Sequence, residues 1–337
     1  MTLKDIAQEA GVSIMTVSNV INGKAGRFSE KTIQRINAII ERNHFVPNQA
    51  ARALAANSSR MIGILIPKYD IQINDAILLN PYISAMLSTF EDFFSRHDYF
   101  ITFRATESFE DEVRLLNAWN VDGLILLHPY TNDDISYVMR SGHAAIVLLD
   151  CKTPYNGILQ VDSDDYRGAY LATEHLLLRG HRRIGIVGNE IRPVVHERIE
   201  GYKAALSAYG VPFDESCVFP YFLNLENGIA VGDILATRRR DITAVLASSD
   251  YCGIGIMEGL RRRGLRIPED VSIIGYDNIN LCDYVYPKLT SVAQGYARKA
   301  QLAAQLLYDR INGNPIAQEH LKLDVHLVER DSVLTRG

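Results

Sequence analysis

At 337 residues the chain is long enough for two or three domains, and its 47% apolar and 22% charged residues are ordinary for a globular protein. No apolar run approaches the ~20 residues of a membrane span, and the charged N-terminus is not a secretory signal, so we expect a cytoplasmic protein with no membrane contact. The formal net charge of −5 is uneven: residues 1–60 carry eight Lys/Arg against four acids, as expected when only one end of a chain binds phosphates.

Three short helices are predicted at the N-terminus. The first begins after Thr2, whose side-chain oxygen can cap free N–H groups, and ends at Gly11, which can adopt a left-handed turn conformation. The second begins after Ser13 and ends near Asn22, and the third begins at Ser29. All three carry apolar residues at helical spacing. Two short helices joined by a glycine turn and braced by a third form a helix-turn-helix unit.

The second predicted helix carries side chains that can read DNA. In such a unit this helix enters the major groove and presents its N-terminal residues to base edges. Opposite its apolar stripe lie Met15 and Asn19, flanked by the hydroxyl residues Thr16 and Ser18. Asn19 can bond a base edge in two directions, while Ile14 and Met15 can contact a thymine methyl group. The alternative is a three-helix bundle with no role on DNA, but the charge asymmetry, the caps and the outward polar residues favour DNA.

A short Ala-rich segment separates this unit from the rest of the chain. Pro47 stops the third helix, and Asn48 can cap a further helix over residues 48–56. This helix has about two turns and is therefore marginal on its own. Residues 57–59 resemble a linker. A marginal helix between two domains can act as a switch, because DNA or a partner decides whether it forms.

From Met61 onward, short apolar runs alternate with amphipathic segments, which predicts an α/β fold with parallel sheets covered by helices on both faces. The number of units is too high for one small domain, and a break near residues 154–162 predicts two lobes. In such folds a ligand binds beyond the carboxyl ends of the strands, and between the lobes where there are two.

Motifs in both parts of the chain resemble the lactose-repressor/galactose-repressor (LacI/GalR) family of transcription regulators. In the first part the resemblance rests on Thr2-Leu3-Lys4-Asp5-Ile6-Ala7, Ala10-Gly11-Val12-Ser13, Thr16-Val17-Ser18-Asn19-Val20-Ile21-Asn22 and Pro47-Asn48 with Ala51-Arg52 and Leu54. In the second part it rests on Val121-Asp122-Gly123-Leu124-Ile125, Arg179-Gly180-His181, Arg198, Ser249-Asp250, Gly275-Tyr276-Asp277-Asn278, Pro287-Lys288-Leu289-Thr290 and Leu327-Val328-Glu329-Arg330. The resemblance is close to full length.

This resemblance implies a domain organisation. The implied parts are a helix-turn-helix headpiece over residues 1–47, a hinge helix and linker over 48–60, and an effector-binding and dimerisation core over 61–337. The core is similar to periplasmic sugar-binding proteins, with lobe one at about 61–160 and 291–320 and lobe two at about 161–290 and 321–337.

The resemblance also implies a repressor that binds double-stranded operator DNA. Two-fold protein symmetry calls for paired half-sites, so we expect a homodimer on a pseudo-palindromic operator. Leu54 is then a wedge, because hinge helices from two protomers enter the minor groove and kink the operator. The predicted DNA-binding residues are Thr2, Ser13, Ile14, Met15, Thr16, Ser18, Asn19, Asn22, Ser29, Asn48, Ala51, Arg52, Leu54 and Ala55.

A small-molecule effector is expected in the cleft between the lobes. The predicted effector-binding residues are Tyr82, Asp150, Arg192, Arg198, Leu223, Asp250 and Asp277. An Arg fork and carboxylates can bracket the vicinal hydroxyls of a sugar, so a sugar or sugar derivative is predicted, with purine-like and phosphorylated effectors left open. Each carboxylate has an alternative role, since an Asp at the end of a strand often only caps the next helix. Val194 and the long segment 69–79 predict an effector of unusual size or polarity.

Two other functions fit parts of the sequence. The pattern Gly253-x-Gly255-x-x-x-Gly259 resembles a dinucleotide-binding motif, but these glycines fall inside a predicted helix rather than at a strand-to-helix turn. The chain has no P-loop, no G-x-S-x-G, no His pair at metal spacing and no C-x-x-C pair, so we expect no enzyme, no metal and no cofactor. A solute-binding transport protein would share the lobes but would need an export signal and would lack the headpiece.

Overall fold

The computed structural model describes residues 1–21, 28–45, 58–68, 77–106, 108–127, 132–140, 145–151, 153, 155–190 and 193–336. The chain divides into two compact units, residues 1–59 and residues 60–337, and each is described by itself. The predicted hinge helix over residues 48–56 lies outside the described residues. Among the residues described, no helix is long and apolar enough to cross a lipid bilayer.

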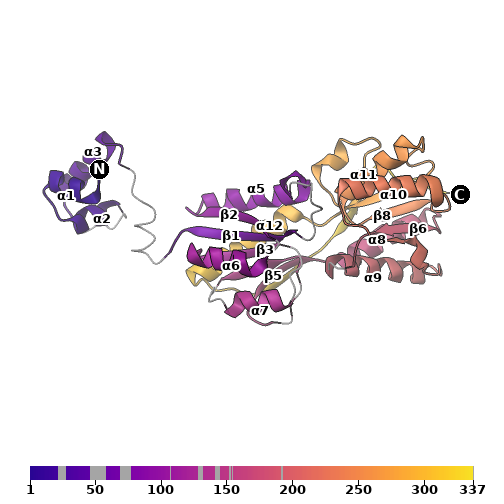
Figure 1. The fold of residues 1–337 in the computed structure, drawn as a ribbon, viewed down its shortest axis with the longest axis horizontal. Helices are drawn as coiled ribbons and strands as arrows, with labels where there is room; N and C mark the ends of the chain where they lie inside the picture. The colour runs from indigo at the N-terminus through magenta and orange to yellow at the C-terminus, as the bar shows by residue number, and fades with distance from the viewer. Residues whose placement is uncertain are drawn as a thin grey trace. The chain divides into compact units, whose positions relative to one another are not determined.

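The first unit contains three helices, α1 (Leu3–Ala10), α2 (Ile14–Ile21) and α3 (Glu30–Arg42), which Figure 1 shows at the N-terminal end of the chain. They begin where the local chemistry predicts, whereas α3 ends at Arg42, earlier than the predicted stop at Pro47. Thr2 and Asp5 form a reciprocal capping box at the start of α1, and Gly11 ends that helix with a φ of 62°. One cluster of buried apolar side chains, which includes Ile6, Val17 and Ile36, joins the three helices. The predicted helix-turn-helix unit is therefore confirmed.

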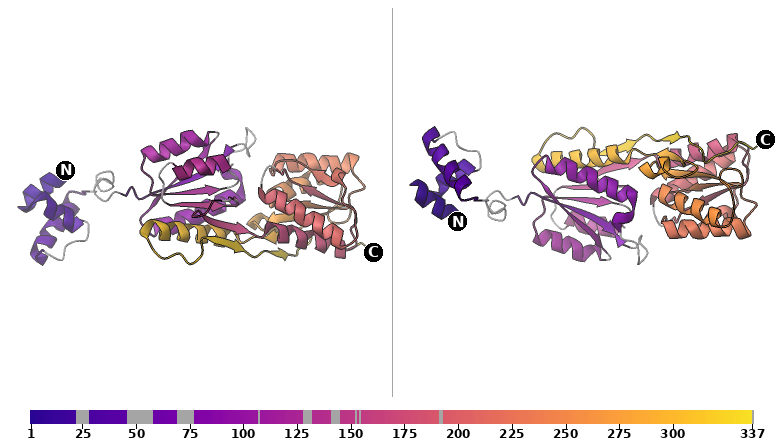
Figure 2. Two further views of the ribbon diagram at one scale, coloured as in Figure 1. Left: turned by 90° about the horizontal axis from the view of Figure 1, so that it is seen from below. Right: turned by 90° about the horizontal axis from the view of Figure 1, so that it is seen from above.

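The second unit contains two six-stranded sheets. The first has the order β11-β5-β4-β3-β1-β2 and is parallel throughout its described pairs. Its strands are β1 (Met61–Pro67), β2 (Phe100–Thr106), β3 (Gly123–Leu127), β4 (Ile146–Leu149), β5 (Leu159–Ser163) and β11 (His320–Leu323). Helices α5 (Pro81–Ser95) and α12 (Tyr296–Asn312) pack on one face, and α6 (Phe109–Ala118) and α7 (Asn132–Arg140) on the other. Figure 2 shows α7 and α12 on opposite sides of this sheet.

The second sheet has the order β12-β10-β9-β8-β6-β7, in which only β12 is antiparallel to its neighbour among the described pairs. Its strands are β6 (Ile184–Val187), β7 (Val218–Phe219), β8 (Ala244–Ala247), β9 (Ser272–Asp277), β10 (Thr290–Ala293) and β12 (His326–Val328). Helices α8 (Asp165–Leu178) and α9 (Pro193–Ala208) pack on one face, and α10 (Leu225–Arg238) and α11 (Asp250–Arg262) on the other. Short 3-10 turns are η2 (Ile77–Leu79), η3 (Glu215–Cys217) and η4 (Asn280–Asp283). This arrangement confirms the predicted two-lobed α/β core.

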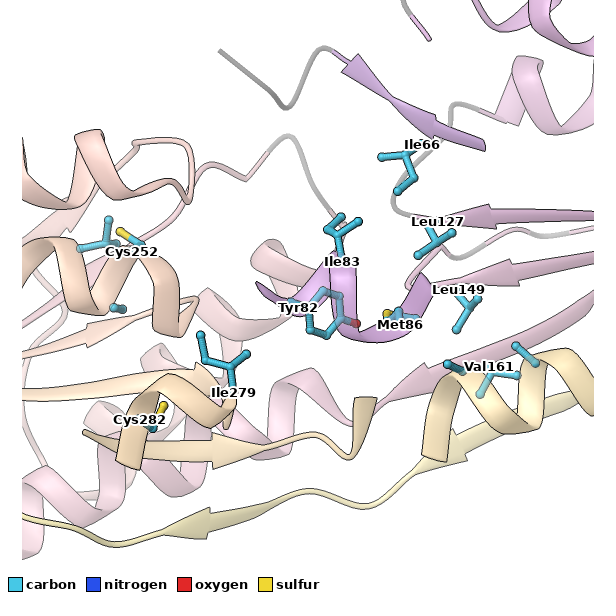
Figure 3. Close-up of a cluster of buried hydrophobic side chains, with 14 of the residues drawn as sticks. Ile66, Tyr82, Ile83, Met86, Leu127, Leu149, Val161, Cys252, Ile279 and Cys282 are labelled. Atoms are coloured by element: carbon cyan, nitrogen blue, oxygen red, sulfur yellow. The ribbon is translucent and has the colours of Figure 1, made fainter. Parts of the chain in front are cut away.

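The first sheet with its helices is called lobe one below, and the second sheet with its helices lobe two. The chain passes between them after β5, β10 and β11. The predicted lobe boundaries at about residues 160, 290 and 320 fall inside these three strands. The chain crosses to the other lobe only after each strand has ended. One cluster of buried apolar side chains includes residues of both lobes, such as Tyr82 and Ile279 (Figure 3).

The glycine pattern that resembles a dinucleotide motif has a packing role. A Cβ atom on Gly255 or Gly259 would lie 2.3 Å from a backbone carbonyl oxygen of α10. A Cβ on Gly228 or Gly232 would meet α11 backbone equally closely, at 2.3 and 2.6 Å. Only glycine allows the two helices to approach this closely. Gly255 and Gly259 of the pattern therefore belong to a helix–helix contact, and the strand-to-helix turn before α11 carries Ser249 as the helix cap instead.

Candidate DNA interface and effector site

Helix α2 exposes large apolar side chains at its N-terminal end. Met15 is 73% exposed and Ile14 is 48% exposed, whereas Val17 and Val20 on the opposite side are buried in the headpiece core. Two adjacent apolar side chains in water are unfavourable unless a partner covers them. Their place at the start of the second helix is the place from which a helix-turn-helix unit reads base edges.

The polar residues around them are held by local hydrogen bonds. The Ser13 hydroxyl accepts from the backbone N–H of Thr16 at 3.1 Å and lies 2.9 Å from the Thr16 hydroxyl. Ser29 caps α3 in the same way, accepting from the N–H of Thr32 at 3.3 Å. Ser18 and Asn19 are half-buried on the sides of α2. These bonds fix the helix starts, and DNA contact by the same residues remains a prediction.

Several predicted site residues lie outside the described residues. For DNA these are Asn22, Asn48, Ala51, Arg52, Leu54 and Ala55, and for the effector Arg192. Of the long segment 69–79, only residues 77–79 are described, as the turn η2. Val194 is buried and packs in the apolar cluster between α8, α9 and the lobe-two sheet.

In lobe one the structure brings Tyr82 and Asp150 together. Asp150 directly follows β4 with a φ of 55°, and Tyr82 is in the first turn of α5. The Tyr82 hydroxyl donates to Asp150 Oδ2 at 2.7 Å, and Lys299 Nζ donates to Asp150 Oδ1 at 2.5 Å. Burial and the neighbouring carboxylate raise the pKa of Tyr82 well above its usual 10, so its hydroxyl stays a proton donor. Both oxygens of Asp150 are therefore bonded within lobe one.

In lobe two Arg198 is the buried cation. Its Nε donates to Asp165 Oδ1 at 2.8 Å, its Nη1 donates to the carbonyl oxygen of Ser248 at 2.5 Å, and the guanidinium carbon lies 3.7 Å from the ring centroid of Tyr276. Burial alone would lower the pKa of Arg198, but Asp165, Tyr276 and Asp277 together outweigh it and raise that pKa. Arg198 therefore stays charged at every accessible pH.

The two predicted carboxylates of lobe two differ in their bonds. Asp250 accepts from the backbone N–H of Ile279 at 2.8 Å through Oδ2 and from the Ser291 hydroxyl at 2.5 Å through Oδ1. A Cβ on Gly275 would lie 2.1 Å from Asp250 Oδ1, so a larger residue at this strand position would displace the Asp250 carboxylate. Burial raises the pKa of Asp250 to about 6. Asp250 thus holds the loop after β9, whereas the cap of α11 is Ser249, so the helix-capping alternative does not describe Asp250.

Asp277 ends β9 with a φ of 117° and is 7% exposed. Its Oδ1 accepts from the side-chain amide of Gln294. Among the described residues, no salt bridge to Asp277 is found. Burial and the nearby Asp250 raise the pKa of Asp277 well above its usual 3.8. Leu223 is half-buried and packs against the apolar clusters on both faces of the lobe-two sheet.

Sequence reasoning missed three buried polar residues at this junction of the lobes. Asp165 pairs with Arg198, Gln294 bonds to Asp277, and Lys299 bonds to Asp150. Lys299 has one signal in the sequence, which is its place in the first turn of a helix, where the helix dipole disfavours a positive charge. Among the described residues, no group of three or more His, Cys, Asp or Glu could hold a metal ion, and the four cysteines, all buried, form no disulfide.

Comparison with known proteins agrees with this architecture. The profile of the family described as bacterial regulatory proteins, lacI family, matches residues 2–48, and that of a periplasmic binding protein-like domain matches residues 173–333. The HTH-type transcriptional repressor PurR of Vibrio atlanticus is 30% identical over 341 residues, which cover 99% of both chains. A PurR repressor of Pasteurella multocida is 29% identical, also over 99% of both chains.

Solved structures show the same fold. A transcriptional regulator CelR in complex with cellobiose has 28% identity and a TM-score of 0.71 over 98% of this chain and 99% of its own. A LacI family regulator from Enterococcus faecium with bound ribose has 33% identity and a TM-score of 0.72 over 82% of this chain and 100% of its own. The Lac repressor dimer bound to operator and the anti-inducer ONPF has 24% identity and a TM-score of 0.86 over 99% of both chains.

Proposed function

The chain belongs to the LacI family of DNA-binding transcriptional repressors, with a periplasmic-binding-protein-like effector domain, and we propose that it binds a pseudo-palindromic operator as a homodimer and responds to a sugar or sugar derivative. The family consists of regulators and not of enzymes. Since DNA is its target, we also propose that it acts in the cytoplasm.

The observation that carries the DNA part is the pair of exposed apolar side chains, Ile14 and Met15, at the start of α2. Residues 1–60 carry four more basic than acidic side chains, so this end of the chain can supply both phosphate attraction and base contact. The homodimer rests on the Lac repressor, which was solved as a dimer on its operator.

The DNA part is tested by selecting operator sequences from a random duplex library and measuring affinity by fluorescence anisotropy. The full chain should enrich a pseudo-palindrome and bind it far more tightly than a scrambled duplex, while a chain lacking residues 1–58 should bind neither. Sedimentation should give a dimer on one operator. Enrichment of a single half-site, or specific binding by the truncated chain, would contradict the proposal.

The effector part rests on charge at the junction of the lobes. Among the described residues, the carboxyl groups buried there are Asp150, Asp162, Asp165, Asp250 and Asp277, and the buried basic side chains are Arg198 and Lys299. Each cation is already paired with one carboxylate, at 2.8 Å for Arg198 and 2.5 Å for Lys299. An excess of acid repels a phosphate and accepts hydrogen bonds from neutral hydroxyls. This supports a neutral sugar over a sugar phosphate.

The effector part is tested by thermal shift, because a ligand that binds only the folded chain raises its melting temperature. The probes are D-ribose and cellobiose, which are bound in two relatives, with glucose 6-phosphate and adenine as the alternative chemistries. We expect a neutral sugar to raise the melting temperature and to change operator affinity. A shift with glucose 6-phosphate or adenine alone would overturn the sugar assignment.

A further inference from the structure

Lys299 is a fully buried lysine in an unfavourable place. Its side chain has no exposed surface, and it lies in the first turn of α12, directly after the crossing from lobe two. Burial and the positive end of a helix dipole both oppose an ammonium group there. A charge held against both effects needs full compensation from its neighbours.

Three oxygen atoms supply that compensation. Lys299 Nζ donates to Asp150 Oδ1 at 2.5 Å, to the Gln294 side-chain oxygen at 2.7 Å and to the Tyr82 hydroxyl at 3.5 Å. An ammonium group has three N–H donors, so these acceptors use all of them. Asp150 and Tyr82 belong to lobe one, whereas Gln294 lies immediately after β10 of lobe two.

Gln294 continues the network into lobe two. Its side-chain N–H donates to Asp277 Oδ1 at the end of β9, while its side-chain oxygen accepts from Lys299 and from the Ser163 hydroxyl. Gln294 is 1% exposed, so its amide has one orientation in which donor and acceptors all match. The bonded order Tyr82–Asp150–Lys299–Gln294–Asp277 therefore spans both lobes, and we call it the interlobe chain.

We propose that Lys299 is the positioning residue that couples the effector-facing carboxylate of lobe two, Asp277, to the Tyr82–Asp150 pair of lobe one. Lys299 fixes the Gln294 amide, and the fixed amide holds Asp277. An effector that bonds to Asp277 competes with that amide and so changes what Lys299 can bond. The effector's part in this rests on the proposed function, whereas the coupling itself belongs to the free protein.

The test measures amide hydrogen exchange of the full chain without DNA or effector. In each variant, the amides that decide the result are at the end of the interlobe chain that the substituted residues do not contact. The double substitution Lys299→Met with Asp150→Asn removes both buried charges together, so that neither is left unpaired. We expect amides 275–279, around Asp277, to exchange about tenfold faster, the factor for one buried hydrogen bond. Gln294→Leu should in turn speed amide exchange in the first turn of α5 and at residues 146–151.

The matched control is Lys322→Met. Lys322 lies on β11 of lobe one and pairs at 2.9 Å with Asp164, the cap of α8. It is half exposed and lies off the interlobe chain, so exchange at 275–279 should not change. If the double variant exchanges faster only in α5, α12 and 146–151, Lys299 is a local structural residue and the coupling is wrong. If that variant does not fold, Gln294→Leu decides alone, and unchanged exchange in lobe one overturns the proposal. The exchange measurement uses no operator and no sugar, so its result does not depend on whether the chain binds either of them. Failure of the proposed function and failure of the coupling are therefore distinguishable.

Discussion

Replacing Arg198 by Met should destabilise lobe two strongly. The guanidinium is 5% exposed and bonds to Asp165 at 2.8 Å and to the Ser248 carbonyl oxygen at 2.5 Å. Met fills a similar volume, so the main loss is electrostatic: Asp165, which is 1% exposed, becomes a buried carboxylate without a cation. Removing one partner of a buried ion pair reduces the free energy of unfolding by about 3–5 kcal/mol.

Urea unfolding followed by circular dichroism measures this loss, and the double variant Arg198→Met with Asp165→Asn is the control. The neutral amide removes the orphan charge, so we expect it to recover at least half of the lost stability. The same single variant should lose its response to the sugar while the folded fraction still binds operator, because Arg198 is in the second unit. A loss below about 1 kcal/mol, or no recovery in the double variant, would refute the ion-pair argument.

The remaining predictions address other parts of the molecule. Met15→Ala should weaken operator binding in anisotropy titrations with the melting temperature unchanged, because its side chain is 73% exposed. Gly259→Ala should lower the free energy of unfolding by about 1–3 kcal/mol, since the added Cβ would lie 2.3 Å from the Ile229 carbonyl oxygen, whereas Gly253→Ala, with its nearest atom at 3.4 Å, should be tolerated. Burial raises the pKa of Asp162 from 3.8 to about 6, so the folded state holds its proton more tightly and loses stability as pH rises between these values. Asp162→Asn should remove that part of the pH dependence in urea titrations at pH 4 to 8, and an unchanged slope would contradict it.

The features that follow from local chemistry could be predicted from the sequence. The helix starts at Thr2, Ser13 and Ser29 depend on a hydroxyl and an N–H three residues apart, and the structure has these bonds. The alternation of apolar runs and amphipathic segments predicted both sheets, because each buried strand must be covered on two faces. The strand ends then placed Asp150 and Asp277 at one junction.

The bonds within that junction could not be predicted in the same way. Asp165 follows Asp164 in the sequence, and nothing local says that Asp164 caps α8 while Asp165 turns inward to Arg198. Lys299 lies on the buried stripe of α12, four and seven residues before Ala303 and Leu306, but this spacing does not identify its partners. Asp150 and Gln294 reach it only because α12 returns across lobe one after the chain leaves lobe two. Such partners are decided by the topology of the crossings, which residue spacing does not contain.

The bonds at the junction also separate the roles of the predicted carboxylates. Asp250 uses both oxygens to hold Ile279 and Ser291, and Asp150 uses both within lobe one. Among the described residues, the one hydrogen bond found for the Asp277 side chain is the one that Oδ1 accepts from a neutral amide, so we propose Asp277 as the carboxylate at which a ligand competes with the protein's own donor. A ligand shifts a conformational equilibrium only by its difference in affinity for the two states. If the interlobe chain is intact in one conformation of the protein and broken in the other, a ligand that bonds to Asp277 binds the two conformations with different affinity. Ligand contacts that are the same in both conformations raise the affinity but shift no equilibrium.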